Sequence, residues 1–172
     1  MEKTSIVKSL NMLAQLIGEG DAGKLFLFYQ ACVADGDEEV AEYATPYSSQ
    51  QAAKNLARAG NWFCIERKAD NLPIGVVGFE SKHGGRFKVQ GMLCLFRPSC
   101  SHDEEVESLS MMIQYAFETL GCRAIQVDCD WSDEADSSLL NFGFTREKGY
   151  EMYYSLDIDD WRKIDAKDSR NA

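Results

Sequence analysis

Several reactive side chains stand together between Cys100 and Glu105, at the predicted start of a helix. The stretch holds a thiol, a hydroxyl, an imidazole and three carboxylates, groups that can carry protons, attack as nucleophiles or bind ligands. Ser101 and Glu104 have the spacing of a capping box, in which each side chain accepts a hydrogen bond from the other residue's backbone N–H. Carboxylates in the first turn also complement the helix dipole and oppose a lowered thiol pKa at Cys100. The pattern therefore favours a self-capped helix start over a nucleophile.

The bulk composition indicates one soluble globular domain. The chain has 172 residues, of which 45% are hydrophobic and 27% are charged, and this size suits a single core. Its net charge of −10 argues against nucleic acid and anionic membranes as partners, and makes a basic peptide or an amine electrostatically easier to bind. We find neither an apolar run long enough to span a membrane nor a secretory signal, so we expect a cytoplasmic protein.

The six cysteines are widely scattered and form no CxxC pair, and the chain has only two histidines. A zinc site is therefore not indicated, and we expect reduced thiols, several of them in the core, and no metal.

The periodicity of apolar residues predicts a mixed α/β domain. The strongest helix runs from about 103 to 120, where one face carries Val106, Leu109, Ile113, Ala116, Phe117 and Leu120 and Gly121 ends the helix. A second helix, 21–33, has apolar residues at helical spacing, namely Ala22, Leu25, Phe26, Tyr29 and Val33. The other predicted elements are a helix at 48–60, a short helix at about 133–141, and strands at 61–68, 74–81, 86–96, 123–130 and 150–158.

These elements predict a single domain over residues 1–162, followed by a charged, frayed tail over 163–172. The fold class is α/β, with a mixed, mostly antiparallel sheet of six to seven strands and helices on both of its faces. Gly91, inside a strand, predicts a bulge or a close approach to the backbone.

Four stretches, taken in order, resemble the GNAT superfamily of acetyl-CoA-dependent N-acetyltransferases, and most of all the branch that acetylates the N-termini of ribosomal proteins. "LPIGVVGFES" is similar to the third strand of that family. "CLFRP" followed by "MMIQYAFETLGCRAIQVDCD" is similar to its fourth strand, third helix and fifth strand. "SSLLNFGFTRE" and "MYYSLDIDDW" resemble its last short helix and closing strand. The resemblance extends from "LIGEGDAGKLFLFYQ" to "YYSLDIDDW", about 145 residues of the chain.

The resemblance implies that acetyl-CoA binds where the fourth and fifth strands separate. Its pantetheine arm would pair with the backbone edge of the fourth strand, and its pyrophosphate would meet a loop with the pattern Gln/Arg-x-x-Gly-x-Gly/Ala. Residues 100–105 stand at the position of this pattern. They contain no glycine and no arginine but three carboxylates, which would repel a pyrophosphate. The implied cofactor-binding residues are Leu93, Cys94, Leu95, Phe96, Ser101, His102, Asp103 and Ser132, the last of which could also cap the short helix.

The resemblance also implies a carboxylate base on the fourth or fifth strand and a hydroxyl acid. Gln90 stands where a fourth-strand glutamate is expected, and an amide cannot accept the proton. Asp128 and Asp130 on the fifth strand are then the candidate bases, with Asp128 preferred, although a solvated strand face would explain both equally well. The candidate acids are Tyr150, Tyr153 and Tyr154, of which Tyr150 and Tyr153 are preferred.

Two functions follow. The first is an N-acetyltransferase that moves the acetyl group of acetyl-CoA directly to a small amine or a peptide N-terminus. The alternative is a non-catalytic, cofactor-deficient GNAT-like module that kept the scaffold and binds a partner. A homodimer is a further expectation for this domain.

Overall fold

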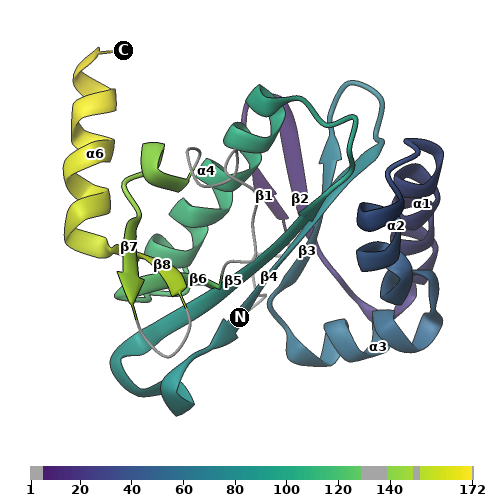
Figure 1. Cartoon of the computed structure of the whole chain (residues 1–172), viewed down its shortest axis with the longest axis horizontal. Helices are drawn as coiled ribbons and strands as arrows, with labels where there is room; N and C mark the ends of the chain where they lie inside the picture. Colours follow the sequence, from purple (N-terminus) through teal and green to yellow (C-terminus); the bar gives the residue numbers. More distant parts are fainter. Residues whose placement is uncertain (1–5, 129–138, 149–151, 172) are drawn as a thin grey trace. The chain divides into compact units, whose positions relative to one another are not determined.

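The chain was analysed as a computed structural model that describes residues 6–128, 139–148 and 152–171 (Figure 1). It divides into two compact units, one of residues 1–78 and 94–112 and the other of residues 79–93 and 113–172. Eight strands form one sheet in the order β1-β2-β3-β4-β5-β6-β8-β7. The α/β class and the mixed, mostly antiparallel sheet agree with the prediction, whereas its six to seven strands are one or two too few.

In the first unit, four antiparallel strands form the sheet. They are β1 (Ile6–Lys8), β2 (Met12–Leu16), β3 (Trp62–Arg67) and the first part of β4 (Pro73–Ser81). The sequence did not predict the β1–β2 hairpin, because its two strands are short and lack a clean alternation of apolar and polar residues.

Three helices belong to this unit, and two of them begin at side-chain caps that the sequence already carries. The three are α1 (Ala22–Ala34), α2 (Glu38–Ala44) and α3 (Gln50–Ala59). Asp37 and Ser49 accept hydrogen bonds from the N–H groups of the first turns of α2 and α3. Gly60, with φ 82°, ends α3 in the left-handed conformation that glycine adopts without a penalty, as predicted.

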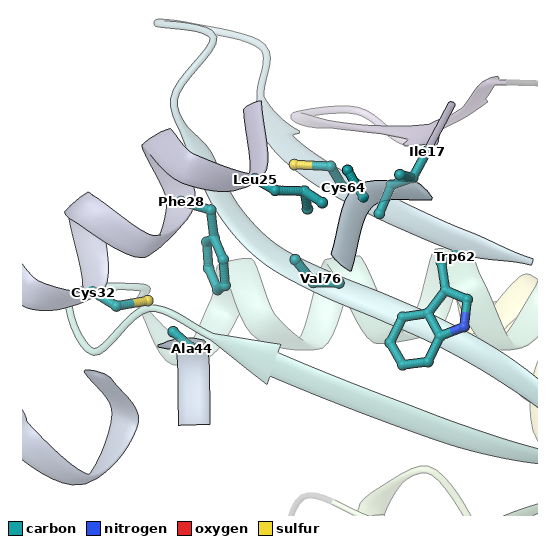
Figure 2. Close-up of a cluster of buried hydrophobic side chains, with 9 residues drawn as sticks. Ile17, Leu25, Phe28, Cys32, Ala44, Trp62, Cys64 and Val76 are labelled. Atoms are coloured by element: carbon teal, nitrogen blue, oxygen red, sulfur yellow. The ribbon is translucent and has the colours of Figure 1, made fainter. Parts of the chain in front are cut away.

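Buried side chains of α1, α2, α3 and the strands form one apolar cluster in this unit (Figure 2). Its members are Ile17, Leu25, Phe28, Cys32, Ala44, Ala53, Trp62, Cys64 and Val76. The residues that alternate with these along β3, Phe63 and Ile65, are fully buried on the opposite face of the sheet. Both faces of the sheet are therefore covered in this unit.

Helix α1 buries a different face from the one that the sequence predicted. Leu25, Phe28 and Cys32 enter the cluster, whereas Phe26 is 42% exposed and Val33 is 49% exposed. The helix is apolar on nearly all sides, so its hydrophobic pattern could not identify the buried side.

Helix α4 (His102–Glu118) begins within one residue of its predicted start. Leu109, Ile113, Ala116 and Phe117 are buried, as the helical spacing predicted. Gly121, with φ 68°, follows the end of the helix.

The second unit contains the start of β5 (Val89–Phe96), then β6 (Ala124–Asp128), β7 (Thr145–Lys148) and β8 (Met152–Asp157). β5 begins three residues later than predicted, because the 3₁₀ segment His83–Lys88 turns through positive φ angles at several positions. The chain after β8 is not frayed: it forms α6 (Ile158–Asn171), and Trp161 stacks on Phe117 with ring centroids 5.0 Å apart. The predicted short helix at 133–141 lies mostly outside the described residues.

Candidate functional site: a free strand edge, a tethered loop and a catalytic row

Strand β5 carries the backbone edge that the resemblance assigns to the pantetheine arm. Its parallel pairing with β6 begins at Val89 and Ala124 and ends at Gly91 and Gln126, whereas β5 continues to Phe96. β6 likewise continues beyond its last pair with β5, where it pairs only with β8 among the described residues. The last part of β5 thus has backbone N–H and C=O groups that β6 does not use, and an extended ligand can pair with such groups.

The side chains on this part of β5 serve packing. Leu95 packs against the apolar cluster of the first unit, and the Phe96 ring lies over Gly75, where a Cβ atom would come within 2.6 Å of the ring. Cys94 is half-buried and Leu93 is 44% exposed. A ligand along Leu93–Phe96 would therefore depend on the backbone rather than on these side chains.

The loop between β5 and α4 is tethered to the end of α1 by an ion pair. Arg97 donates from Nε and NH2 to the two carboxylate oxygens of Asp35, at 2.9 Å each, and the Ser99 N–H donates to the same carboxylate at 3.0 Å. Both side chains are nearly buried, and the Arg97 hydrogen bonds hold the pKa of Asp35 well below its usual range. The backbone of this loop is thus fixed from one side.

Arg97 lies between the end of β5 and the start of α4, three residues before the stretch 100–105 to which the resemblance assigned the family pattern. Its guanidinium binds Asp35. The assignment of the pattern to 100–105 stays a prediction.

The predicted capping box at the start of α4 is confirmed. The Glu104 N–H donates to Ser101 Oγ at 3.2 Å, and the Ser101 N–H donates to Glu104 Oε1 at 3.0 Å. Glu104 also binds Arg67 of β3, with Nε–Oε2 at 2.5 Å and NH2–Oε1 at 3.2 Å. These bonds lower the pKa of Glu104, and the arginine charge offsets that of the carboxylate. Of the three carboxylates that were expected to repel a pyrophosphate, one, Glu104, is therefore paired with a positive charge.

Two other acidic residues of α4, Glu107 and Glu105, are also not simply solvated. Glu107 accepts hydrogen bonds from Ser9 Oγ at 2.8 Å and from the side-chain amide of Asn11 at 2.9 Å, which ties α4 to the β1–β2 hairpin. Glu105 is half-buried, and burial raises its pKa, an effect that nearby His102 opposes. Burial therefore favours the neutral form of Glu105, and Asp103 is the one carboxylate of the first turn that is exposed.

Cys100 does not have the properties of a nucleophile. Its thiol pKa is raised to about 12, first by burial and then by the neighbouring charges of Glu104 and Glu105. The thiol stays protonated at neutral pH, as the sequence indicated.

Among the backbone N–H groups of residues 99–103, some donate a hydrogen bond and others have no acceptor in the described part of the chain. Those of Ser99 and Ser101 donate to carboxylates, and that of Cys100 donates to the Arg97 carbonyl at 3.0 Å. The N–H groups of His102 and Asp103 have no acceptor among the described residues. Two adjacent donors at a helix N-terminus suit one phosphate group, so these residues fit the pyrophosphate of acetyl-CoA in spite of the missing glycines.

In the second unit, the structure places two predicted catalytic residues side by side. Asp128 of β6 is directly opposite Tyr153 of β8 in the antiparallel pair, and Tyr153 is directly opposite Glu147 of β7. Residues that pair in this way project from the same face of a sheet, with Cβ atoms about 4.5–5.5 Å apart. A carboxylate and a phenol thus share one row, which we call the catalytic row (Asp128, Tyr153 and Glu147).

Lys82 binds the first member of this row. Its Nζ lies 2.9 Å from Asp128 Oδ2, and its stem passes so close to Gly91 that a Cβ there would lie 2.5 Å from Lys82 Cε. This contact is the close approach that Gly91 predicted. The sequence did not reveal Lys82 or Glu147 as neighbours of Asp128, because only the strand register brings them together.

The remaining candidate site residues are either outside the described part of the chain or buried. Asp130, Tyr150 and Ser132 lie outside the described residues, so their assignments stay predictions. Tyr154, next to Tyr153, faces the opposite side of β8 and is 1% exposed, and its hydroxyl has no hydrogen-bond partner among the described residues. The side-chain carbonyl oxygen of Gln90 is buried and likewise lacks a partner in the described part of the chain.

Other site types find little support in the described part of the chain. Its five cysteines, Cys32, Cys64, Cys94, Cys100 and Cys122, form no disulfide bond with one another, in agreement with the predicted reduced thiols. No group of three potential metal ligands comes together among the described residues. None of the described helices is long and apolar enough to cross a membrane.

Comparison with known proteins identifies the family. Residues 15–145 match the model of the acetyltransferase (GNAT) domain, whereas no curated protein sequence matches significantly. A similar solved structure is that of apo FdhC, a nucleotide-linked sugar GNAT, with TM-score 0.73 and 20% identity over 96% of this chain and 97% of that chain.

Two further structures share the fold. Ribosomal-protein-S5-alanine acetyltransferase from Vibrio fischeri has TM-score 0.70 and 14% identity over 91% of this chain and 98% of that chain. Mycobacterium smegmatis RimJ, in complex with CoA-disulfide, has TM-score 0.63 and 12% identity over 87% and 83%. The family match spans most of the chain, and this chain therefore belongs to the GNAT family of acetyltransferases, which transfer the acetyl group of acetyl-CoA to amine or peptide acceptors.

Proposed function

We propose that the chain transfers the acetyl group of acetyl-CoA directly to a primary amine, either of a small molecule or of a peptide N-terminus. The observation that supports this proposal is the early end of β5–β6 pairing at Gly91, because β6 does not pair with the last part of β5 and an extended ligand can take its place. The net charge of −10 favours a cationic acceptor, because it attracts a protonated amine at long range.

The cofactor half of the proposal rests on backbone groups. The edge of β5 over Leu93–Phe96, beyond its last pair with β6, pairs with the pantetheine arm, and the N–H groups of His102 and Asp103 bind one phosphate of the pyrophosphate. The Ser101 hydroxyl accepts the N-cap bond and keeps its O–H as a further donor. Arg97 and Glu104 hold the loop in place through Asp35 and Arg67.

The catalytic half rests on the catalytic row. Acetyl-CoA supplies the acetyl group as a thioester. Asp128 takes the proton of the attacking amine, directly or through a water molecule, and the Tyr153 hydroxyl donates a proton to the departing thiolate. The new amide bond forms as the carbon–sulfur bond breaks. Lys82 is a positioning residue that orients the Asp128 carboxylate.

The experiment that tests the proposal is continuous detection of the free thiol released from acetyl-CoA. The acceptors would be a set of polyamines, lysine-like amines and peptides with free N-termini, with N-acetylated peptides as the matched control. We expect thiol release that requires a free amine, and mass spectrometry should find one added acetyl group on the acceptor. Thiol release at the same rate with and without an amine would contradict transfer.

Two further expectations stay predictions. A homodimer is tested by sedimentation velocity, and a cytoplasmic location is tested by cell fractionation.

A further inference from the structure

Helix α1 has a second apolar face that nothing in the described chain covers. Its members, which we call the α1 outer stripe, recur at helical spacing and are Gly23, Phe26, Leu27, Gln30, Val33 and Ala34. All six are exposed, and Leu27 is 55% and Val33 49% exposed. The stripe contains one polar residue and no charge.

This face is not a by-product of burying the helix. Leu25, Phe28 and Cys32 already fill the apolar cluster from the other side of α1 (Figure 2). A surface helix ordinarily carries charged residues opposite its buried face, whereas a helix that is apolar on all sides is ordinarily covered. Exposed apolar surface of this kind, bordered by polar residues, is typical of a site that binds another molecule.

The charges on α2, the helix that packs against α1, indicate what that molecule is like. Helix α2 packs against α1 and presents an acidic group, the acidic α2 face, formed by Asp37, Glu38, Glu39 and Glu42. No lysine, arginine or histidine occurs between Lys24 and Lys54. Among the described residues, none of these four acids forms an ion pair.

This charge disfavours two classes of occupant. A second copy placed symmetrically on this face would bring two acidic α2 faces together, and like charges at close range cost free energy. A nucleic acid would be repelled for the same reason. A cationic partner gains at both parts of the surface, because apolar side chains can cover the stripe while basic side chains meet the acids.

We propose that the α1 outer stripe and the acidic α2 face together bind a protein segment that presents apolar side chains beside lysine or arginine. The inference concerns binding alone, so it does not depend on acetyl transfer. Both parts of the surface lie in one compact unit of the chain.

Fluorescence anisotropy with a labelled amphipathic peptide of about 14 leucine and lysine residues tests this proposal. The Leu27→Gln/Val33→Gln variant should weaken binding about tenfold, because it removes apolar contact area. The Glu38→Gln/Glu39→Gln/Glu42→Gln variant should weaken it about fivefold and reduce its dependence on salt. All five positions are exposed, so circular dichroism should find both variants folded.

Matched controls separate this surface from general acidity. Leu10→Gln removes another exposed leucine, 84% exposed, and Glu19→Gln/Glu80→Gln/Asp165→Asn removes three exposed acids elsewhere. Both controls should change the affinity less than twofold. Equal weakening in controls and test variants, or no binding of the peptide, would overturn the proposal. So would a dimer, seen by sedimentation, that the Leu27→Gln/Val33→Gln variant abolishes, because the occupant would then be a second copy.

Discussion

Replacing Asp128 with asparagine is expected to lower kcat/KM for amine acetylation by about two to three orders of magnitude, the range typical of a lost general base. The amide keeps the shape of the side chain but cannot accept the proton of the attacking amine. The substitution also removes the ion pair with Lys82. Because Asp128 lies on an exposed strand face, thermal unfolding should change little, and the loss can be assigned to catalysis. Steady-state thiol release at several pH values measures the effect.

Asp157 supplies the matched control for this prediction. It is an exposed aspartate in β8, it projects from the same face of the sheet as Asp128, and it pairs with Ala124 at the far end of β6. Asp157→Asn keeps a side chain that can cap the start of α6 and should leave kcat/KM within about twofold. If Asp128→Asn were as active as Asp157→Asn, Asp128 would not be the base, and Glu147 of the catalytic row would be the next candidate.

Replacing Asp35 with alanine is expected to lower the free energy of unfolding by about 2–3 kcal/mol. The substitution leaves the nearly buried Arg97 without its carboxylate and the Ser99 N–H without its acceptor. For a chain of this size, that loss corresponds to a melting temperature lower by roughly 4–12 °C. The KM for acetyl-CoA should rise as well, because the loop that precedes α4 loses its anchor. Urea unfolding and acetylation kinetics measure the two effects, with Glu39→Ala as an exposed acidic control.

The lowered pKa values of Asp35 and Glu104 predict how the free energy of unfolding changes with pH. The folded pKa of Asp35 is lowered by Arg97, and that of Glu104 is lowered by Arg67. Each group therefore adds stability that is fully present above its unfolded pKa, about 3.9 for aspartate and 4.3 for glutamate, and that is lost as the pH falls through the lower folded value. The free energy of unfolding should decrease below about pH 4, and the decrease should be smaller in Asp35→Asn. An unchanged slope in that variant would contradict the role of the Asp35–Arg97 pair.

The features that follow from local sequence were predictable. The capping box of Ser101 and Glu104 and the end of α3 at Gly60 depend on residues close to each other in the chain, so short spacing patterns predicted them. The buried face of α4 followed equally from helical spacing. The free thiols of the described cysteines followed from the absence of paired spacing.

The features that depend on contacts between distant residues could not be predicted. Arg67 and Glu104 are 37 positions apart, and Lys82 and Asp128 are 46 apart, so no local pattern links either pair. The buried side of α1 was misjudged for a related reason, since both sides are apolar and only tertiary packing selects one. These contacts change the interpretation of the helix start, because Glu104, one of its three first-turn carboxylates, is bound to Arg67.

His102→Pro is the variant that examines the loop most specifically. His102 is the first residue of α4, where proline is tolerated in a helix, and the substitution removes one of the two free N–H groups proposed to bind phosphate. His102→Ala keeps that N–H and is the matched control. Acetyl-CoA should bind His102→Pro more weakly than His102→Ala, and equal affinity would remove the His102 N–H from the proposed site.

The central claim is that the acidic, glycine-free start of α4 still binds acetyl-CoA, and thermal unfolding with and without the ligand tests it most directly. At about 100 times the dissociation constant, binding should stabilise the folded chain by about 2.7 kcal/mol, which raises the melting temperature by roughly 5–10 °C. Coenzyme A should give a shift of similar size, whereas acetate should give none. An unchanged melting temperature at millimolar acetyl-CoA would contradict the claim and would favour a GNAT fold that binds a partner without the cofactor.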